Sequence, residues 1–132
     1  MAEIFSCLLV FAGHCFGDFV FQTAWITNHK STNKMVLAVH SVVYTVTVLF
    51  FFFVVDINYY LRFNYEVIGI LLFSSHAMID YVKCKLRDDI AYKCKNEKEP
   101  SLDKLHKREN ELFYQDQALH LIILGICFAA FR

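Results

Sequence analysis

The sequence lacks an excess of charge of either sign. It contains 13 lysine and arginine residues against 13 aspartate and glutamate residues, and its formal net charge is +0 at pH 7. Proteins that bind nucleic acid through its phosphates are usually rich in basic residues. The overall charge therefore predicts no nucleic-acid partner, and the distribution of charge along the chain becomes the informative feature.

Paired cysteines are also missing. The 5 cysteines are scattered, without a Cys-x-x-Cys pair, so neither a disulfide framework nor a zinc ribbon is expected. We expect them to be reduced and mostly buried. The N-terminus has no lysine or arginine and no small-residue cleavage site, which argues against a secretory signal peptide.

Apolar residues are what the sequence has in abundance. Of its 132 residues, 57% are hydrophobic and 17% aromatic, and the mean hydropathy is +0.39. This composition is too apolar for a soluble domain, so the expected solvent is a lipid bilayer. The length suits one domain, residues 1–132.

Four apolar stretches are candidates to cross a hydrocarbon core of about 30 Å, which takes roughly 20 helical residues. The stretch at 35–55 is rich in valine, phenylalanine and threonine but has no glycine or proline, and it is too long for a strand of an ordinary sheet. We therefore predict an all-α integral membrane four-helix bundle. The expected spans are residues 4–26, 35–55, 67–82 and 112–131, with a charged amphipathic arm at 84–111.

Basic residues are distributed unevenly between the expected loops. Apart from Arg62 and Arg132, the 13 basic residues follow the first span or the third, and alternation of the spans puts these two segments on one side. The positive-inside rule makes that side cytoplasmic. We therefore expect a multi-pass protein of the inner membrane with both termini outside.

Polar pairs interrupt three of the four stretches. In each, a histidine and an aspartate stand four residues apart, so both side chains project from one face of one helix. The pairs are His14 and Asp18, His76 and Asp80, and Asp116 and His120. The second span adds His40, followed four residues later by Tyr44. Because the spans alternate in direction, all these groups fall in the cytoplasmic half and are expected to converge on one site.

Seven such side chains inside a membrane need a physical explanation. Each charge near mid-membrane costs up to about 3 kcal/mol on insertion, whereas an interhelical hydrogen bond returns only about 0.6 kcal/mol. A bound metal would offset the difference, since structural zinc contributes roughly 10 kcal/mol or more. We predict a divalent-metal site; the alternative is a polar network that fixes helix packing or relays protons. The predicted ligands are His14, Asp18, His40, His76, Asp80, Asp116 and His120.

The donor types indicate which metal and which chemistry to expect. Imidazoles and carboxylates without thiolate suit zinc, with manganese or iron as alternatives. Seven donors exceed the four of a typical zinc site, so either two ions share a bridging aspartate or some donors lie outside the coordination sphere. The carboxylates expected to be catalytic are Asp18, Asp80 and Asp116. The side chains expected to orient substrate or ligands are Gln22, Lys30, Tyr44 and Lys83.

The spacing of these residues resembles that of a known family. The shared pattern is His14-x-x-Gly17-Asp18-Phe19-x-x-Gln22, then Lys30 and His40, His76-x-x-x-Asp80-x-x-Lys83, and Asp116-Gln117-x-x-His120. It is similar to that of uncharacterised small integral membrane proteins of bacteria and their phages, domain-of-unknown-function family 3307. The resemblance covers nearly the whole chain and implies a four-span membrane protein, but it supplies no reaction.

Several functions fit these expectations. The favoured one is an intramembrane metal-dependent hydrolase that acts at the cytoplasmic face on a lipid or polyprenyl phosphate or ester, with membrane lipid as its partner. The ligand types are also similar to those of membrane metal-dependent hydrolases, which is an analogy only. The alternatives are a metal or proton carrier, a non-enzymatic membrane partner with a structural His/Asp network, and a di-iron oxidoreductase. The sequence indicates no oligomeric state.

Overall fold

The computed structural model describes residues 2–59, 63–96 and 102–130, and within them every regular element is a helix. The predicted all-α class is therefore confirmed. The elements are α1 (Ala2–Cys15), the π-helical segment η1 (Phe16–Val20) that continues it, α2 (Ala24–His29), α3 (Lys34–Tyr59), α4 (Tyr65–Lys95) and α5 (Leu102–Ala130).

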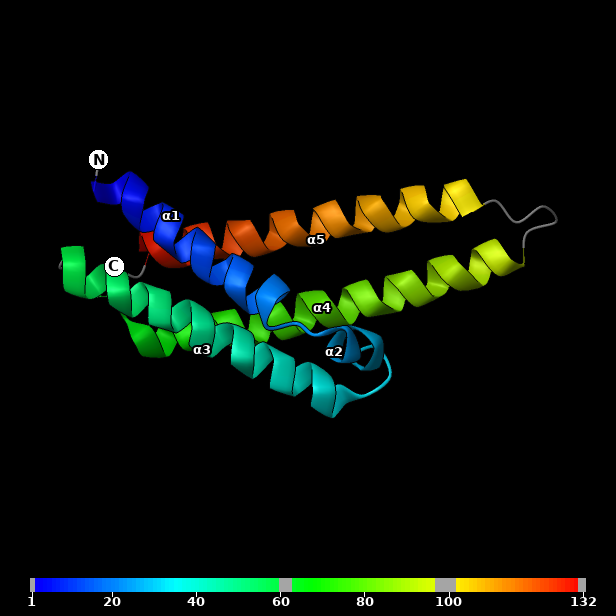
Figure 1. Ribbon diagram of the computed structural model, residues 1–132, viewed down its shortest axis with the longest axis horizontal. Helices are drawn as coiled ribbons and strands as arrows, with labels where there is room; N and C mark the ends of the chain where they lie inside the picture. The colour runs from blue at the N-terminus through cyan, green and yellow to red at the C-terminus, as the bar shows by residue number, and fades with distance from the viewer. Residues whose placement is uncertain (1, 60–62, 97–101, 131–132) are drawn as a thin grey trace.

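The four long helices form a closed bundle. Helix α1 packs against α3, α3 against α4, α4 against α5, and α5 returns to contact α1. Helices α4 and α5 extend well beyond the other two, and α2 lies beside this extended end (Figure 1). The start of α1 and the end of α5 lie together at the opposite end of the molecule.

One continuous face of α4 shows how the sequence positions both the core and the polar site. Its buried residues recur every four positions: Ile68, Leu72, His76, Asp80 and Cys84. This spacing keeps side chains on one face of a helix. The same inward face is therefore apolar near the start of α4 and becomes polar at His76.

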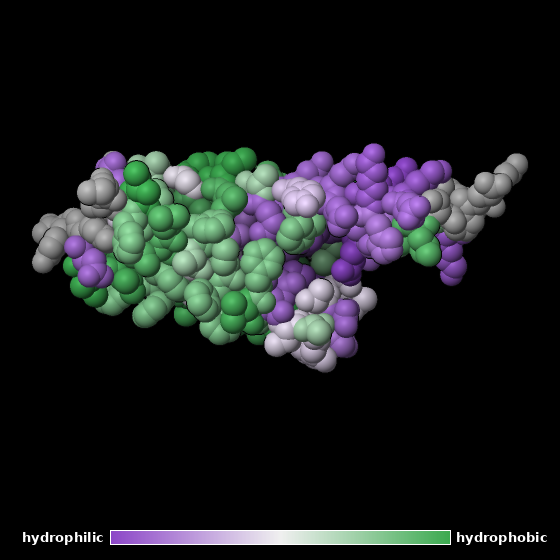
Figure 2. Space-filling model, turned by 45° about the horizontal axis from the view of Figure 1, so that its top comes forward, coloured by the Kyte–Doolittle hydropathy of each residue, from purple (hydrophilic) through white to green (hydrophobic). Residues whose placement is uncertain are grey.

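The outer surface of the bundle is apolar. Large hydrophobic side chains such as Val46, Phe50, Ile70 and Ile122 are more than half exposed. On the face seen in Figure 2, hydrophobic residues cover the half of the molecule that lacks the helix extensions. Soluble proteins rarely expose apolar patches of this extent. Four helices of the described chain are long and apolar enough to cross a membrane: Glu3–Val20, Lys34–Asn58, Tyr65–Lys95 and Leu102–Ala130.

Several predicted span limits do not coincide with the ends of the helices. The first span was expected to reach residue 26, but its helix ends at Val20, and residues from Ala24 belong to the separate helix α2. The side chain of Thr23 caps α2 by accepting a hydrogen bond from the Ile26 amide at 3.3 Å.

The described residues of the expected 84–111 arm belong to the two longest helices. Its first part continues α4 to Lys95 and its last part opens α5 at Leu102, because α4 keeps an inward face through the buried Cys84 and Cys94. Residues 97–101 of the arm, and the basic Arg62 and Arg132, lie outside the described residues.

We predict that Gly17→Ala destabilises the fold. A Cβ atom at Gly17 would lie 2.9 Å from Cδ2 and 3.2 Å from Cα of the buried Tyr44, and overpacking of this kind costs about 1–3 kcal/mol. The thermal midpoint of the purified protein should fall.

Gly125→Ala is the matched control, because a Cβ there meets no atom of the described residues within 4 Å. Its midpoint should stay level or rise slightly, since alanine favours a helix over glycine by about 1 kcal/mol. Equal midpoints for the two variants would contradict the close packing of η1 on α3.

Candidate metal centre

A layer of polar side chains crosses the bundle where η1, α3, α4 and α5 meet. None of the predicted ligands is more than 6% exposed: His14, Asp18, His40, His76, Asp80, Asp116 and His120. Along α4, Asp80 lies about 22 Å from Tyr65 at 1.5 Å per residue. The layer is therefore deep within the apolar band but nearer to its polar end.

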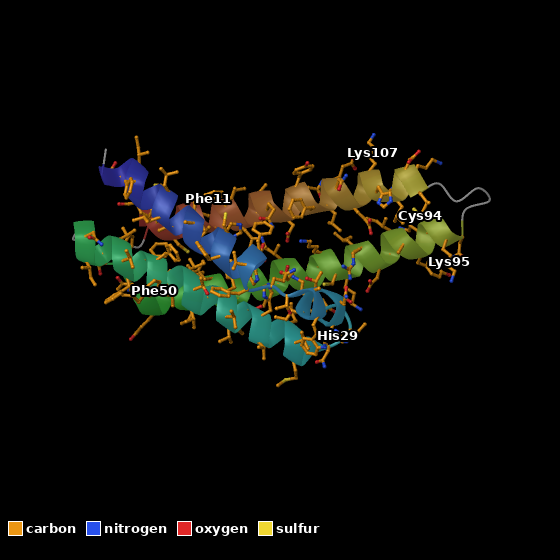
Figure 3. The ribbon with its side chains drawn as sticks, viewed as in Figure 1. Phe11, His29, Phe50, Cys94, Lys95 and Lys107 are labelled. Carbon is orange, nitrogen blue, oxygen red and sulfur yellow. The ribbon has the colours of Figure 1, made fainter. Side chains whose placement is uncertain are left out.

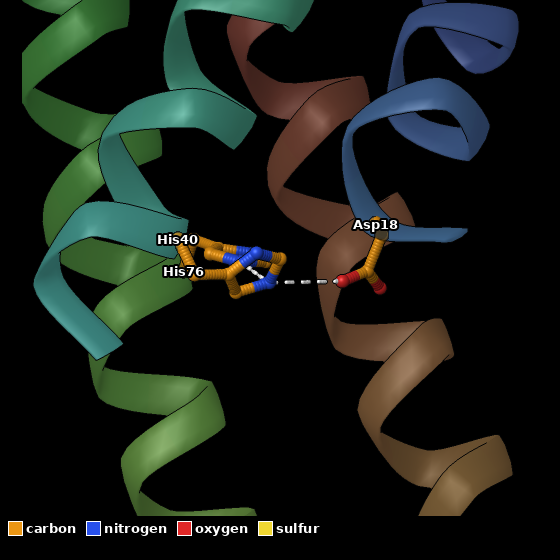
Figure 4. Close-up of side chains that lie close together, drawn as sticks. All are labelled: Asp18, His40 and His76. Carbon is orange, nitrogen blue, oxygen red and sulfur yellow. Dashed lines mark hydrogen bonds and ion pairs between the residues drawn. The ribbon is translucent and has the colours of Figure 1, made fainter. Parts of the chain in front are cut away.

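The first group of donors joins three helical segments. Asp18 comes from η1, His40 from α3 and His76 from α4, and the two imidazoles turn toward the carboxylate (Figure 4). The Nε2 atoms of His40 and His76 are 3.1 Å apart, and His40 Nε2 is 3.5 Å from Asp18 Oδ1. Donors about 2.1 Å from a tetrahedral zinc are about 3.4 Å apart, so this spacing suits one ion.

The second group contains Asp18 again, with Asp116 and His120 of α5. Their donor atoms lie within 4.8 Å of one another. His120 Nδ1 donates to the main-chain oxygen of Asp116 at 2.8 Å, so in the neutral imidazole Nε2 carries a lone pair. Both that Nε2 and Asp116 Oδ1 are buried and have no hydrogen-bond partner among the described residues. Fixing one imidazole nitrogen by a carbonyl and leaving the other free is typical of metal-ligating histidines.

The two donor groups differ in the hydrogen bonds that hold their imidazole rings. The Nδ1 atoms of His40 and His76 are buried and have no protein partner within the described residues, so the first group lacks the outer hydrogen bonds that usually orient metal-bound imidazoles. The ring of His76 is held instead by stacking on Tyr44, with ring centroids 3.8 Å apart and planes 6° from parallel.

His14 lies beside these groups and belongs to neither. Its Nδ1 is 3.1 Å from the Tyr44 hydroxyl, and its Nε2 is 3.0 Å from Gln117 Oε1. Because an amide oxygen only accepts, His14 Nε2 donates to it, and Nδ1 accepts from the tyrosine. Both ring nitrogens are therefore engaged, and the role of His14 as a ligand stays a prediction.

Gln117 is a site residue that the sequence reasoning did not assign. Its amide nitrogen donates to Asp18 Oδ2 and to Asp116 Oδ2, each at 3.0 Å. It therefore fixes the orientation of both carboxylates of the second group while it accepts from His14. Its position directly after Asp116 in the motif could have indicated a role in the site. Adjacent helical residues point about 100° apart, however, so the spacing alone predicted that Gln117 lies outside the helix face that carries Asp116 and His120.

Two lysines complete the layer. Lys30, the C-cap of α2, is 2.6 Å from Asp80 Oδ2 and donates to Gln22 Oε1 at 3.0 Å. Lys83 pairs with Asp116 Oδ2 at 2.5 Å. The structure thus places the four predicted orienting residues around the donor groups: Gln22, Lys30, Tyr44 and Lys83.

The layer contains three aspartate carboxylates but only two lysine ammonium groups. Asp80 and Asp116 each have a lysine partner, whereas the partners of Asp18 are His40 and Gln117. An unpaired buried carboxylate is costly. A cation at Asp18 would remove that cost, and Asp18 is the residue shared by both donor groups. These residues therefore fit a divalent metal ion, and a proton on an imidazole is the alternative source of charge.

Comparison with protein-family models gives a match over residues 4–131 to a family described as "Protein of unknown function (DUF3307)". This confirms the resemblance seen in the motif spacing. No curated protein and no solved structure matches the chain.

We predict that Asp18→Asn abolishes metal binding at both groups. Asparagine preserves the size of the side chain and removes the charge that both groups share. Elemental analysis of protein reloaded with zinc, manganese or iron should show loss of all bound metal, whereas His120→Gln should lose only the ion of the second group.

His106→Gln is the control, because the His106 side chain of α5 is 69% exposed and lies outside both groups. It should bind as much metal as the wild type. Wild-type protein with no more metal than Asp18→Asn would mean that the layer is a polar network.

Proposed function

The chain belongs to the DUF3307 family of proteins of unknown function, and from the chemistry of its site we propose that it is a membrane-embedded, metal-dependent hydrolase. It acts at the cytoplasmic face on a lipid or polyprenyl phosphate or ester. Zinc is the preferred ion, and one or two ions are bound.

The sharing of Asp18 between two donor groups carries this proposal. A carboxylate between two sets of imidazole and carboxylate donors suits a pair of neighbouring ions. Divalent ions, when bound, make water acidic enough to attack and withdraw charge from a phosphoryl or ester oxygen. A structural zinc ion usually takes four ligands, so several of the seven donors would have no role around a single structural ion.

Asp80 is the carboxylate we assign to proton transfer. Its Oδ2 lies 3.5 Å from His40 Nε2 and 3.7 Å from His76 Nε2, yet it belongs to neither donor group. Lys30 holds it in place. A carboxylate so placed accepts a proton from the attacking water, which is general-base catalysis.

A closed core favours an enzyme over a carrier. Between the polar layer and the end of the molecule that holds the start of α1, the described core is mainly apolar, with side chains such as Val48, Phe52 and Ile68, and its buried polar side chains are the small hydroxyls of Ser6 and Thr45. A carrier needs polar access from both sides. On the other side, one cavity lined by polar residues such as Gln22, Lys30 and Lys83 adjoins the layer, so polar access is found on that side.

The position of the basic residues supports the proposed orientation. Lys95 and Lys107 lie on the extended ends of α4 and α5, far from Phe11 and Phe50 (Figure 3). By the positive-inside rule the extended end faces the cytoplasm, with both termini outside, and the inner membrane is the proposed location.

We predict opposite labelling of two engineered cysteines. Glu66 and Lys107 are both exposed and lie near opposite ends of the molecule. In spheroplasts, an impermeant thiol reagent should label Glu66→Cys, and should label Lys107→Cys only after permeabilisation. Wild-type protein gives the background of the native cysteines. The native Cys94 is not a useful reporter, because it is buried between the helices. The opposite labelling pattern would move the site to the outer leaflet.

We predict that Asp80→Asn retains metal but loses turnover by at least about 100-fold, the usual range for a general base. Purified protein is incubated with bacterial lipid extract and with polyprenyl phosphates, with and without chelator, and products are followed by mass spectrometry. Wild-type turnover should disappear with chelator and return with zinc.

Lys85→Gln is the control, since Lys85 is exposed and lies over the Tyr81 ring, outside the polar layer. A metal-loaded wild type that hydrolyses none of these lipids, but moves zinc into vesicles, would make the protein a carrier. Turnover that persists in the presence of chelator would show that the reaction does not need a metal.

A further inference from the structure

A cavity of about 250 Å³ adjoins the polar layer on its open side. Its walls come from the residues around α2, from α4 and from the first half of α5. Three of its lining side chains are cationic, Lys30, Lys83 and Arg87, and one is anionic, Glu109. Glu109 lies 3.8 Å from His106 in an exposed pair. Cationic side chains therefore outnumber anionic ones among the residues that line this cavity.

Arg87 is the cation of this cavity that has no carboxylate partner among the described residues. Lys30 and Lys83 are each paired with a carboxylate of the polar layer. Arg87 stands four residues after Lys83 on the same face of α4 and is partly buried. It has no ion pair or hydrogen bond within the described residues, and a guanidinium presents a planar fork that binds phosphate through two hydrogen bonds.

An apolar groove of about 210 Å³ borders the cavity and shares two of its lining residues. It runs between α4 and α5, past Val82, Leu86 and Leu119, whose side chains are between 44% and 49% exposed on the lipid-facing surface. The groove ends at Asp116, a donor of the second group. Lys83 and Leu112 line both the groove and the cavity.

We propose that the cavity and groove together bind a membrane lipid with a phosphate monoester head group, which enters sideways between α4 and α5. Arg87 and Lys83 hold the phosphate, and the groove holds the hydrocarbon chain. A zwitterionic choline head group fits less well, because none of the lining residues of the cavity is aromatic and aromatic faces are what bind quaternary ammonium groups.

This proposal names the substrate class of the hydrolase and rests on that proposed function for its catalytic meaning, but binding is measured without turnover. Full-length protein, with chelator present, is equilibrated in detergent micelles that contain equal amounts of dioleoyl phosphatidic acid and dioleoyl phosphatidylcholine. Native mass spectrometry then gives the ratio of the two lipids retained per protein. Phosphatidic acid should exceed phosphatidylcholine by about tenfold, as expected for a charge-assisted bidentate contact.

Arg87→Gln should remove most of that preference, and Arg87→Lys should keep part of it, because lysine retains the charge but not the fork. The matched control, Lys85→Gln, changes the same charge on the same helix outside the cavity and should leave the ratio within about twofold of the wild type. Helix content by circular dichroism shows whether each variant folds. If Arg87→Gln does not fold, Arg87→Lys still tests the role of the guanidinium group.

Val82→Trp tests the groove, since the larger ring fills the path of the hydrocarbon chain. It should reduce retention of phosphatidic acid while inorganic phosphate is still bound. A wild type without preference between the two lipids, or an Arg87→Gln variant with an unchanged ratio, overturns the proposal. Binding of inorganic phosphate without lipid preference also overturns it, because the cavity would then serve a soluble anion. Preference for phosphatidic acid without any hydrolysis would leave this proposal standing and refute the hydrolase.

Discussion

The burial of three aspartate carboxylates at one level of an apolar bundle is the constraint on which the rest of the structure depends. Each carboxylate needs positive charge or hydrogen-bond donors nearby, because an unpaired ion is unstable in such surroundings. Lys30 and Lys83 form ion pairs with Asp80 and Asp116. Asp18 is left to His40 and to the amide of Gln117. Asp18, the carboxylate with the least compensating charge, is thus the residue shared by the two donor groups that could hold a metal ion.

The break after the first long helix makes this arrangement achievable. If the helix continued straight to residue 26, Lys30 would lie well beyond the polar layer, since a helix rises 1.5 Å per residue. Instead the chain leaves the helix after the π-helical segment η1, and α2 returns Lys30 to Asp80. Segments of π-helix often occur at functional sites, and this one carries Asp18.

The polar layer also divides the bundle into two different halves. On one side the core is packed with apolar and aromatic side chains, among them Phe52, Phe63 and Leu72. On the other side lie the cationic cavity and the apolar groove, which share Lys83. A ligand with a charged head and a hydrocarbon chain matches both surfaces at once. The hydrolase and its lipid substrate are proposals that follow from this one-sided access.

The sequence by itself determined the helical class, the four long apolar helices and the pairing of histidine with aspartate on single helix faces, because these depend on period and length along one chain. The tertiary structure decided the rest: that Gln117 joins the site, that His14 is engaged by Tyr44 and Gln117, that Lys30 reaches Asp80, and that Asp18 is shared. A periodic pattern fixes where a side chain points from its own helix. It does not fix how far neighbouring helices shift or rotate, and hydrogen bonds near 3 Å respond to such movements.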